Sequence, residues 1–476
     1  MDSLMQMLEG FLYVIALVAV VDAVLHVRTS QGAIAWTVSL LTMPVITLPL
    51  YLIFGRRTFD RYIEARKNLG PEINPKVQHL SNSLSAFRYA LKPEERCLQV
   101  METIAPLPFT HGNKIDLLCD GEASFTAMFQ AIDSAQRYIV IQFYILRHDN
   151  IGHQLQKRLI AKARQNVAVY VLYDSVGSFE LKSDFINEMR QAGISVCEFN
   201  TTNLTSNRFQ LNFRNHRKIV IVDGETAFIG GLNVGDEYLA KVAEFPVWRD
   251  THFQLSGPCV QVVQLAFVED WISVANHMPD LRWSYPSASE QASQGLALLV
   301  LPWGPDREVE RGTFSFLHLI NSAQKRLWLA SPYFIPDVVM RSALQLAVLR
   351  GVDVRILVPE QTDNLLNQLG TFSNVKRLIP SGIKFYFYTP GFMHQKIMLL
   401  DDSISFIGSA NFSNRSFHLN FEINALVSDA NFAERVETML VQDFAASQAV
   451  TAARLESKPF YFKVLSMLVR LVSPLL

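Results

Sequence analysis

The sequence predicts an α/β protein in which two similar halves form one body about a pseudo-two-fold axis, preceded by an apolar helical hairpin. Two nearly unbroken apolar runs, residues 11–27 and 33–54, predict the hairpin. The rest of the chain passes twice through the same order of strand-like and helix-like segments. Strands that alternate with helical segments indicate α/β units around a largely parallel sheet.

The apolar runs predict transmembrane helices at about residues 8–27 and 33–54, inside an N-terminal segment 1–57. A helix needs ~20 residues to cross a bilayer, and both runs are near that length. Asp22 interrupts the first run, whereas Pro44 and Pro49 would kink the second or make it re-entrant. A buried core hairpin and a cleaved signal peptide are alternatives, and the latter is disfavoured because residues 1–10 lack Lys and Arg.

A basic cluster after the second run predicts the orientation of the hairpin. Basic residues tend to stay on the cytoplasmic side, so the chain after Phe54 is expected in the cytoplasm together with the N-terminus. The connection between the runs, residues 28–32, is then expected on the opposite side of the membrane. The cluster contains Arg56, Arg57, Arg61, Arg66 and Lys67.

The body repeats itself in sequence. Residues 131–137 read AIDSAQR, residues 319–325 read LINSAQK, and an apolar run follows each. Internal similarity of this kind indicates two copies of one structural unit. The expected segments are a juxtamembrane linker at 58–108, a first repeat at 109–278, a linker at 279–294, a second repeat at 295–449 and an amphipathic C-terminal helix at 450–476. That helix either lies at a membrane interface or packs on the body.

Composition restricts the class of partner. The formal net charge is −1, so the chain has no general basic excess of the kind that binds nucleic acid. Its four cysteines are scattered, and neither they nor the histidines have the spacing of zinc ligands. We therefore expect reduced core thiols and neither a metal nor a cofactor.

One motif, His-x-Lys-x-x-x-x-Asp, occurs once in each half. Three fixed residues match by chance at roughly one start position in 8,000. The flanking sequence agrees too, because a Gly and then an Asn follow each His at identical offsets, in the segments 228–233 and 406–411. The motif residues are His216, Lys218 and Asp223 in the first half and His394, Lys396 and Asp401 in the second.

The residue types of the motif suit transfer of a phosphoryl-linked group. A His-x-Lys segment on a strand points both side chains to one face. One imidazole would attack phosphorus while the other protonates the leaving alkoxide and later deprotonates the incoming alcohol. The two lysines would neutralise the non-bridging oxygens. Candidates for further contacts with the phosphate are Asn233, Asn411 and Ser409.

Carboxylates complete the candidate site. A catalytic histidine needs an acceptor for its second ring nitrogen, and Asp250 and Glu422 follow the two motifs at corresponding places in the repeat. Asp223 and Asp401 belong to the motif, but each follows an apolar strand. A structural role at the end of that strand is therefore favoured for them over a direct part in catalysis.

The paired motifs, from about Phe109 to Ala449, resemble those of the phospholipase D superfamily. The stretches 212–238, 331–336 and 415–422, together with the hairpin that ends at residues 51–56, resemble bacterial cardiolipin synthases. The resemblance implies two phospholipase D-like repeats and an integral, multi-pass enzyme of the bacterial inner membrane. It also implies that two phosphatidylglycerol molecules give cardiolipin and glycerol through a phosphatidyl-histidine, with His216 as nucleophile and His394 as general acid and base.

Two other functions use the same features. A phospholipase D-type hydrolase or a nuclease would pass the same intermediate to water, although the hairpin favours a lipid acceptor and the net charge disfavours a nuclease. A membrane scaffold with an inactive catalytic fold is disfavoured because both motifs are complete. The oligomeric state is left open.

Overall fold

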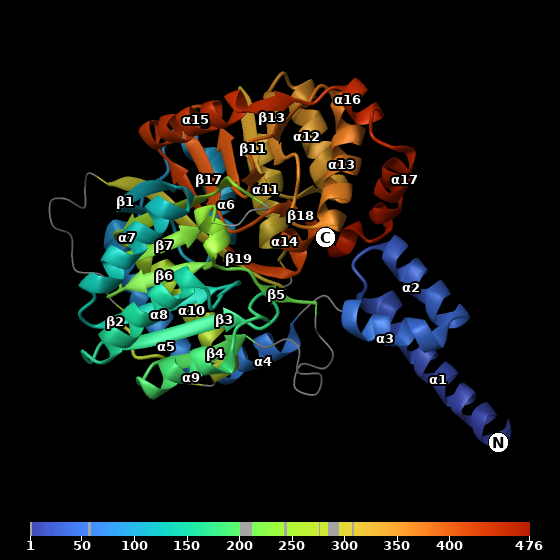
Figure 1. Ribbon diagram of the computed structural model, residues 1–476, viewed down its shortest axis with the longest axis horizontal. Helices are drawn as coiled ribbons and strands as arrows, with labels where there is room; N and C mark the ends of the chain where they lie inside the picture. The colour runs from blue at the N-terminus through green and yellow to red at the C-terminus, as the bar shows by residue number, and fades with distance from the viewer. Residues whose placement is uncertain are drawn as a thin grey trace.

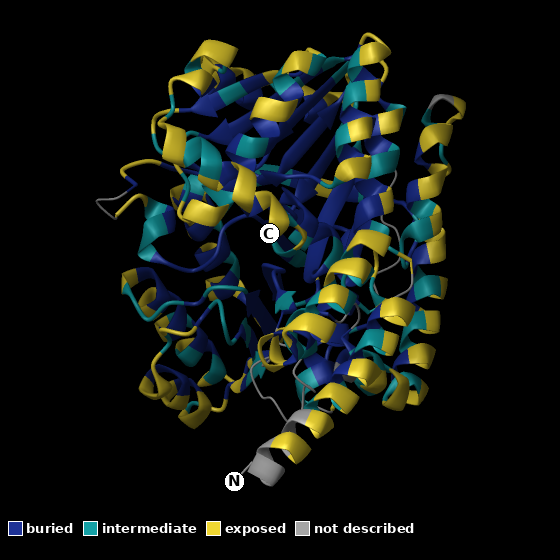
Figure 2. Cartoon of the chain, turned by 90° about the vertical axis from the view of Figure 1, so that its right-hand side faces the viewer, coloured by how far each residue is buried: buried dark blue, intermediate teal, exposed yellow. Residues whose placement is uncertain are grey.

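The computed structural model describes residues 2–55, 59–199, 212–241, 245–275, 277–283, 295–306 and 309–476. Its body is built on one continuous sheet with helices on both faces, and the N-terminal helices stand apart from it (Figure 1). The strands are almost entirely buried, whereas exposed residues lie mainly on the helices (Figure 2).

The sheet joins the two halves of the chain edge to edge. Its strand order is β20-β14-β13-β11-β16-β17-β19-β10-β1-β9-β7-β6-β2-β3-β4, and the halves meet where β1 (Thr110–Cys119) pairs antiparallel with β10 (Leu296–Trp303). Reading outward from this junction, each half repeats the same sequence of strands. The predicted pseudo-two-fold arrangement is therefore present.

The first half follows the order expected from the repeat. After β1 come α7 (Asp120–Ser134), β2 (Tyr138–Phe143), α8 (Asn150–Ala163), β3 (Ala168–Asp174), α9 (Ser183–Gln191), β4 (Ser195–Phe199), β5 (Arg214–Asn215), β6 (Ile219–Val222), β7 (Thr226–Gly230), β8 (Trp248–Arg249), β9 (Thr251–Ser256) and α10 (Cys259–Ala275).

The second half repeats that order with a few additional short elements. After β10 come α11 (Arg311–Ser322), β11 (Arg326–Ala330), β12 (Phe334–Ile335), α12 (Val338–Leu349), β13 (Asp353–Pro359), α13 (Leu365–Leu378), β14 (Lys384–Tyr388), β15 (Phe392–Met393), β16 (Ile397–Leu400), β17 (Ile404–Gly408), β18 (Phe412–Ser413), α14 (Asn414–His418), β19 (Asn420–Ser428), α15 (Ala430–Ala445) and β20 (Ser447–Ala449).

The prediction of a largely parallel sheet was wrong, because the sheet is mixed. Along the main strand order, the outer strands β2-β3-β4 and β11-β13-β14 pair in parallel, as the helical crossovers between them require, and the central strands pair antiparallel. The strand that follows each motif, β6 or β16, forms a tight antiparallel hairpin with the next strand. Such short connections can join only antiparallel strands, and the motifs consequently lie in the antiparallel centre.

Separate cores lie on the two faces of the sheet. On one face, α7, α8 and α9 cover the first half, and α11, α12 and α13 cover the second, each over its own apolar cluster. On the other face, α10 and α15 share a single cluster that crosses the junction. This common core fixes the halves against each other and so positions whatever lies between them.

The N-terminal segment forms three helices, α1 (Asp2–His26), α2 (Ser30–Thr42) and α3 (Pro44–Phe54). Within the described part of the chain, no helix combines the length and the apolar character needed to cross a bilayer. The second predicted span is broken at Met43, because the residue before a proline is disfavoured in helical conformation. Asp22 in the first run accepts a hydrogen bond from Tyr51 Oη at 2.6 Å.

The connection between α1 and α2 lies against the body. Arg28 forms an ion pair with Glu310, with Nε 2.9 Å from Oε1. The sequence-based topology placed this connection across the membrane from the body, whereas in the structure it contacts the body.

The segment expected to be a juxtamembrane linker is instead part of the folded body. It contains α4 (Asp60–Asn68), α5 (Gly70–Leu84) and α6 (Gln99–Ile104). Tyr62 is buried and donates a hydrogen bond to Asp270 of α10 at 3.0 Å. The second predicted linker, 279–294, lies largely outside the described residues.

The C-terminal segment contains two helices, α16 (Ala452–Glu456) and α17 (Phe460–Leu468), where the sequence predicted one. Phe462 of α17 packs edge-on against Phe372 of α13, with ring centroids 5.0 Å apart. Phe460 and Tyr461 on the same helix are exposed. The helix thus packs on the body and also presents apolar side chains outward.

Candidate active site

The two motifs lie between strands at the centre of the sheet. His216 and Lys218 immediately precede β6, and His394 and Lys396 immediately precede β16. The sequence placed each pair within a strand, but the ladder begins one residue after the lysine. In both halves the lysine ammonium donates a hydrogen bond to the carbonyl of its own histidine, with Lys218 Nζ at 2.7 Å in the first.

Each motif is held by the opposite half of the chain. The segment β5, just before His216, pairs in parallel with the start of β19, and the His216 amide donates to the Phe421 carbonyl at 2.9 Å. Likewise β15 pairs in parallel with β8, and the His394 amide donates to the Arg249 carbonyl at 2.7 Å. These backbone contacts bring each motif to the carboxylate that follows the other motif.

The two predicted carboxylates contact the two histidines in a crossed pattern. Nδ1 of His216 lies 3.1 and 3.0 Å from the two carboxylate oxygens of Glu422. Nδ1 of His394 lies 2.7 Å from Oδ2 of Asp250. An ionised carboxylate at Nδ1 keeps the proton there and leaves the Nε2 lone pair for chemistry.

The environments of the two carboxylates differ. Glu422 accepts hydrogen bonds from Ser409 Oγ at 2.5 Å, Ser416 Oγ at 2.8 Å and Asn420 Nδ2 at 3.2 Å, in addition to His216. Besides His394, Asp250 accepts a hydrogen bond from the Thr251 amide at 2.7 Å. Gly231, which corresponds to Ser409 in the repeat, is so close to Asp250 that a Cβ there would lie 2.1 Å from its Oδ1.

These surroundings shift the pKa values of the two carboxyl groups in opposite directions. Burial raises the pKa of Asp250 to about 6, although Lys396 and the Thr251 amide act against it. Burial also acts to raise the pKa of Glu422, but His216, Lys218 and the Ser409 hydrogen bond outweigh it and hold that pKa below its ordinary value. Glu422 is therefore the more firmly ionised of the two.

The cationic groups of the site are strongly desolvated. Burial lowers the pKa of His216 to about 4 against the opposing effect of Glu422, and burial with Lys396 and Lys218 holds the pKa of His394 well below its ordinary value. Burial lowers the pKa of Lys396 to about 8 and holds that of Lys218 well below its ordinary value. An anion placed between these groups would oppose every one of these shifts, because it favours their charged forms.

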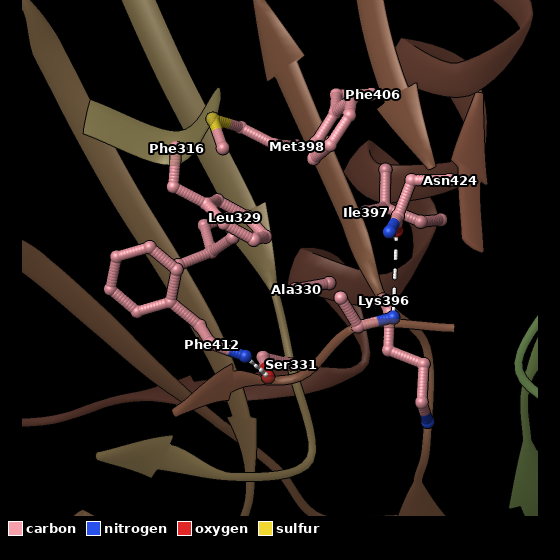
Figure 3. Close-up of a pocket in the computed structure, with 11 residues that line it drawn as sticks. Phe316, Leu329, Ala330, Ser331, Lys396, Ile397, Met398, Phe406, Phe412 and Asn424 are labelled. Carbon is pink, nitrogen blue, oxygen red and sulfur yellow. Dashed lines mark hydrogen bonds between the residues drawn. The ribbon is translucent and has the colours of Figure 1, made fainter. Parts of the chain in front are cut away.

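An apolar pocket beside Lys396 contributes to the burial that lowers the pKa of this lysine. The pocket lies behind this lysine, whose ammonium group points away from the lining (Figure 3). Asn424 and Ser331 are the other polar side chains in it, and they hold the amides of Ala410 and Phe412. The apolar side chains that line it come from the core of the second half: Phe316, Leu329, Ala330, Ile397, Met398, Phe406, Ala410 and Phe412.

The phosphate-contact candidates are engaged with protein groups. Asn233 accepts from the Ile145 amide at 3.1 Å and donates to Tyr238 Oη at 2.6 Å. Ser409 donates to Glu422, and the Asn411 amide donates to Ser416 Oγ at 3.1 Å. Contact of these three residues with a phosphate stays a prediction.

Asp223 and Asp401 lie at the far ends of β6 and β16 from the histidines. Each has a positive φ and accepts the backbone amides of the turn that leads into the neighbouring strand: residues 136–138 for Asp223 and residues 324–326 for Asp401. Their side chains thus accept hydrogen bonds within a turn, away from the two histidines.

Sequence reasoning missed several groups around the histidines. Tyr144 packs edge-on against His216, with ring centroids 5.2 Å apart, and lies under the ammonium group of Lys218. The ring centroid of Tyr238 lies 6.1 Å from that of His394. Ser416 and Asn420 both precede Glu422 by no more than six positions, and these nearby polar residues were the available signal in the sequence.

In each motif, the side chain of the residue between His and Lys contacts a carboxylate of a helix that packs on the sheet, α10 or α15. Arg217 is buried and forms an ion pair with Asp270 of α10, Nη1 to Oδ1 at 2.8 Å. It also donates to the Glu422 carbonyl at 3.1 Å. In the second half, Gln395 Nε2 donates to Asp443 of α15 at 3.1 Å, and Arg249 pairs with the same carboxylate. Within the described residues, no cluster of three His, Cys, Asp or Glu side chains could hold a metal ion.

A body of two pseudo-symmetric α/β halves, with a His-Lys pair from each meeting in one crossed site, defines a protein of the phospholipase D superfamily. The chain belongs to the cardiolipin synthase family within it. The family model described as cardiolipin synthase, PLD-like domain, matches residues 128–271 and 316–444. A second model, phospholipase D-nuclease N-terminal, matches residues 12–56.

Individual relatives agree with this assignment. Proteins named cardiolipin synthase A from Pseudomonas putida (strain W619) and Pseudomonas fluorescens (strain SBW25) are each 42% identical, over 98% of this chain and 97% of their own. Among solved structures, phosphatidylserine synthase from Haemophilus influenzae Rd KW20 superposes with a TM-score of 0.62 at 17% identity, covering 81% of this chain and 100% of that one. This last similarity concerns the fold alone.

Proposed function

We propose that this protein transfers the phosphatidyl group of one phosphatidylglycerol to the headgroup hydroxyl of another, forming cardiolipin and releasing glycerol. The observation that carries the proposal is the crossed site with two histidines, in a chain similar over 98% of its length to proteins named cardiolipin synthase A. A hydrolase is the second candidate, because the same first step with water as acceptor would give phosphatidic acid.

In the first step, Nε2 of one histidine attacks the phosphorus of the donor lipid. The bond from phosphorus to the headgroup glycerol oxygen breaks, and the other histidine supplies the proton for the leaving alkoxide. The products of this step are a phosphatidyl-histidine and free glycerol. Lys218 and Lys396 neutralise the non-bridging oxygens, and their buried position strengthens this interaction.

In the second step, the histidine that gave up its proton removes one from the terminal hydroxyl of the acceptor lipid. The resulting alkoxide attacks phosphorus, the bond from phosphorus to nitrogen breaks, and cardiolipin leaves. The steps mirror each other, so the reaction is reversible and needs no external energy source.

The unequal carboxylates favour His216 as the nucleophile. A phosphatidylated imidazole that keeps its Nδ1 proton is cationic, and firmly ionised Glu422 stabilises that charge. Asp250 has a raised pKa and supports the charge on His394 less strongly, which makes His394 the better proton donor. Ser409 and Ser416 contribute by holding Glu422 in place.

The N-terminal helices suit attachment to a membrane, which is where both substrates reside. Apolar side chains on all three are exposed, among them Phe11 at 65%, Val18 at 66% and Val45 at 72%. An apolar surface this extensive is unusual on a soluble monomer and typical of contact with lipid. We infer an integral enzyme of the bacterial inner membrane, with its catalytic body in the cytoplasm.

The test is a lipid assay with the purified full chain and phosphatidylglycerol alone, in mixed micelles. Cardiolipin and glycerol should appear in equal amounts. Phosphatidic acid as the main lipid product would favour the hydrolase, and His216→Ala, prepared in the same way, controls for contaminating enzymes.

A further inference from the structure

The two ends of the α2–α3 unit meet the same segment of the catalytic body. At its start, the Arg28 guanidinium lies 2.9 and 3.1 Å from the two carboxylate oxygens of Glu310. Just beyond its end, the Phe59 amide donates to the Pro305 carbonyl at 2.8 Å. The chain therefore leaves the body surface at Arg28 and returns to it by Phe59.

Helices α2 and α3 are each too short to cross a membrane. They contain 13 and 11 residues, which correspond to about 20 Å and 16 Å at ~1.5 Å per residue. The hydrocarbon of a bilayer is ~30 Å thick. The break between them at Met43 turns the chain back, so that α2 and α3 pack against each other and against α1.

The α2–α3 unit has a polar base, where α2 begins and α3 ends, and an apolar tip around the break at Met43. At the base, His26 and Tyr51 both contact Asp22, and Arg28 forms the ion pair with Glu310. The tip carries exposed apolar side chains: Leu41, Met43, Val45 and Ile46. Residues 29–55 contain no charged residue, and arginines flank them on both sides at Arg28 and at residues 56–57.

We propose that α2 and α3 form a re-entrant hairpin, which enters the hydrocarbon of the bilayer from the side of the catalytic body and returns to that same side. The flanking arginines lie at the level of the headgroups, and the apolar tip lies in the acyl chains. The proposal rests on the membrane attachment proposed above. It differs from a two-span hairpin in the position of residues 28–32, which face the same compartment as the body.

This arrangement brings the lipid surface next to the active site. Glu310 lies 3.8 Å from His418, the last residue of α14. The same short helix carries Ser416, whose hydroxyl donates to Glu422 beside His216. A lipid whose acyl chains lie around the hairpin has its headgroup at the surface from which α14 leads to the histidines.

Labelling with a membrane-impermeant maleimide tests the proposal in the full chain. The background is Cys97→Ser, which removes the exposed native thiol. Ser30→Cys probes the connection and Ser342→Cys on α12 probes the body, and both serines are exposed in the structure. Val45→Cys probes the tip, and Gln31→Cys repeats the first probe with a different residue.

Membrane vesicles of both orientations give the readout. Ser30→Cys, Gln31→Cys and Ser342→Cys should all react in the same vesicle orientation, while Val45→Cys should react in neither. Reaction of Ser30→Cys and Ser342→Cys in opposite orientations would overturn the re-entrant hairpin in favour of two spans. Full reaction of Val45→Cys in membrane-bound protein would show that the tip lies outside the hydrocarbon, which would also overturn the re-entrant hairpin. Recovery of the protein without membranes would instead overturn the proposed membrane attachment.

Discussion

Glu422, from the second half of the chain, accepts the Nδ1 hydrogen bond of His216, from the first half, at 3.0 Å. Asp250 and His394 make the reciprocal contact at 2.7 Å. Each histidine thus depends on the other half for its tautomer and orientation. The catalytic unit is consequently the whole two-fold body, in which the core shared by α10 and α15 holds the two halves together.

Both histidines should be indispensable for transfer. His216→Ala removes one imidazole of the pair and His394→Ala removes the other, and each should reduce cardiolipin formation by at least about 10²–10⁴-fold, the range of a general acid–base contribution alone. The lipid assay measures the loss, with membrane content and melting temperature checked beside it. Near-normal turnover by either variant would contradict the two-histidine mechanism.

The pH dependence of kcat/KM should show two limbs. Asp250 holds His394 only when ionised, so activity should fall as pH drops through about 6, where that acid becomes protonated. Lys396 neutralises phosphate only when protonated, so activity should also fall as pH rises through about 8. Rates in mixed micelles across pH 5–9 measure both limbs.

Two variants assign these limbs to residues. Lys396→Arg should move the alkaline limb to higher pH, because guanidinium stays charged throughout this range. Asp250→Asn should lower activity and abolish the acid limb, since an amide does not titrate there. An alkaline limb unchanged in Lys396→Arg would assign that ionisation to another group.

The sequence predicted both motifs, both orienting carboxylates and the pseudo-two-fold body, because the motif and its carboxylate occur at corresponding positions in both halves of the chain. It could not predict which carboxylate pairs with which histidine, since the crossing depends on β5 pairing with β19 and β15 with β8. Periodicity did not separate parallel from antiparallel pairing in buried strands, so the sheet was misjudged. Hydropathy could not show that Arg28 reaches Glu310, a contact between residues far apart in sequence.

Ser409 should act on Glu422 and leave affinity for the lipid unchanged. Ser409→Gly makes this position match Gly231 of the first repeat and removes a hydrogen bond to a buried carboxylate, an interaction of about 1.5–3 kcal/mol. We expect kcat to fall roughly 10- to 150-fold at unchanged KM for phosphatidylglycerol. Ser416→Ala, which removes a second donor to Glu422, should behave alike. A rise in KM with kcat preserved would instead indicate contact of Ser409 with the phosphate.

Arg217 should be essential for stability. Arg217→Met leaves Asp270 buried without its cation, and breaking a buried pair from one side costs about 3–5 kcal/mol. Melting of the detergent-solubilised chain, followed by circular dichroism, should show a large drop in melting temperature. Arg137→Met is the matched control, because the Arg137–Glu225 pair is exposed and such pairs contribute about 0–1 kcal/mol. Equal effects of the two substitutions would contradict a bracing role for Arg217.

The covalent intermediate should form on His216. Acid hydrolyses the phosphorus–nitrogen bond of a phosphatidyl-histidine. The reaction with labelled phosphatidylglycerol is therefore quenched in alkali, and the protein is then digested to find which peptide carries the label. His394→Ala should still accumulate some adduct, since the donor alkoxide leaves slowly without its acid, whereas His216→Ala should form none. Glu422→Gln should reduce the amount trapped more than Asp250→Asn does, because Glu422 is the carboxylate that stabilises the cationic phosphatidyl-imidazole. Label found on His394 would reverse the two roles, and the crossed pairing would then require Asp250, with its raised pKa, to support the charged intermediate.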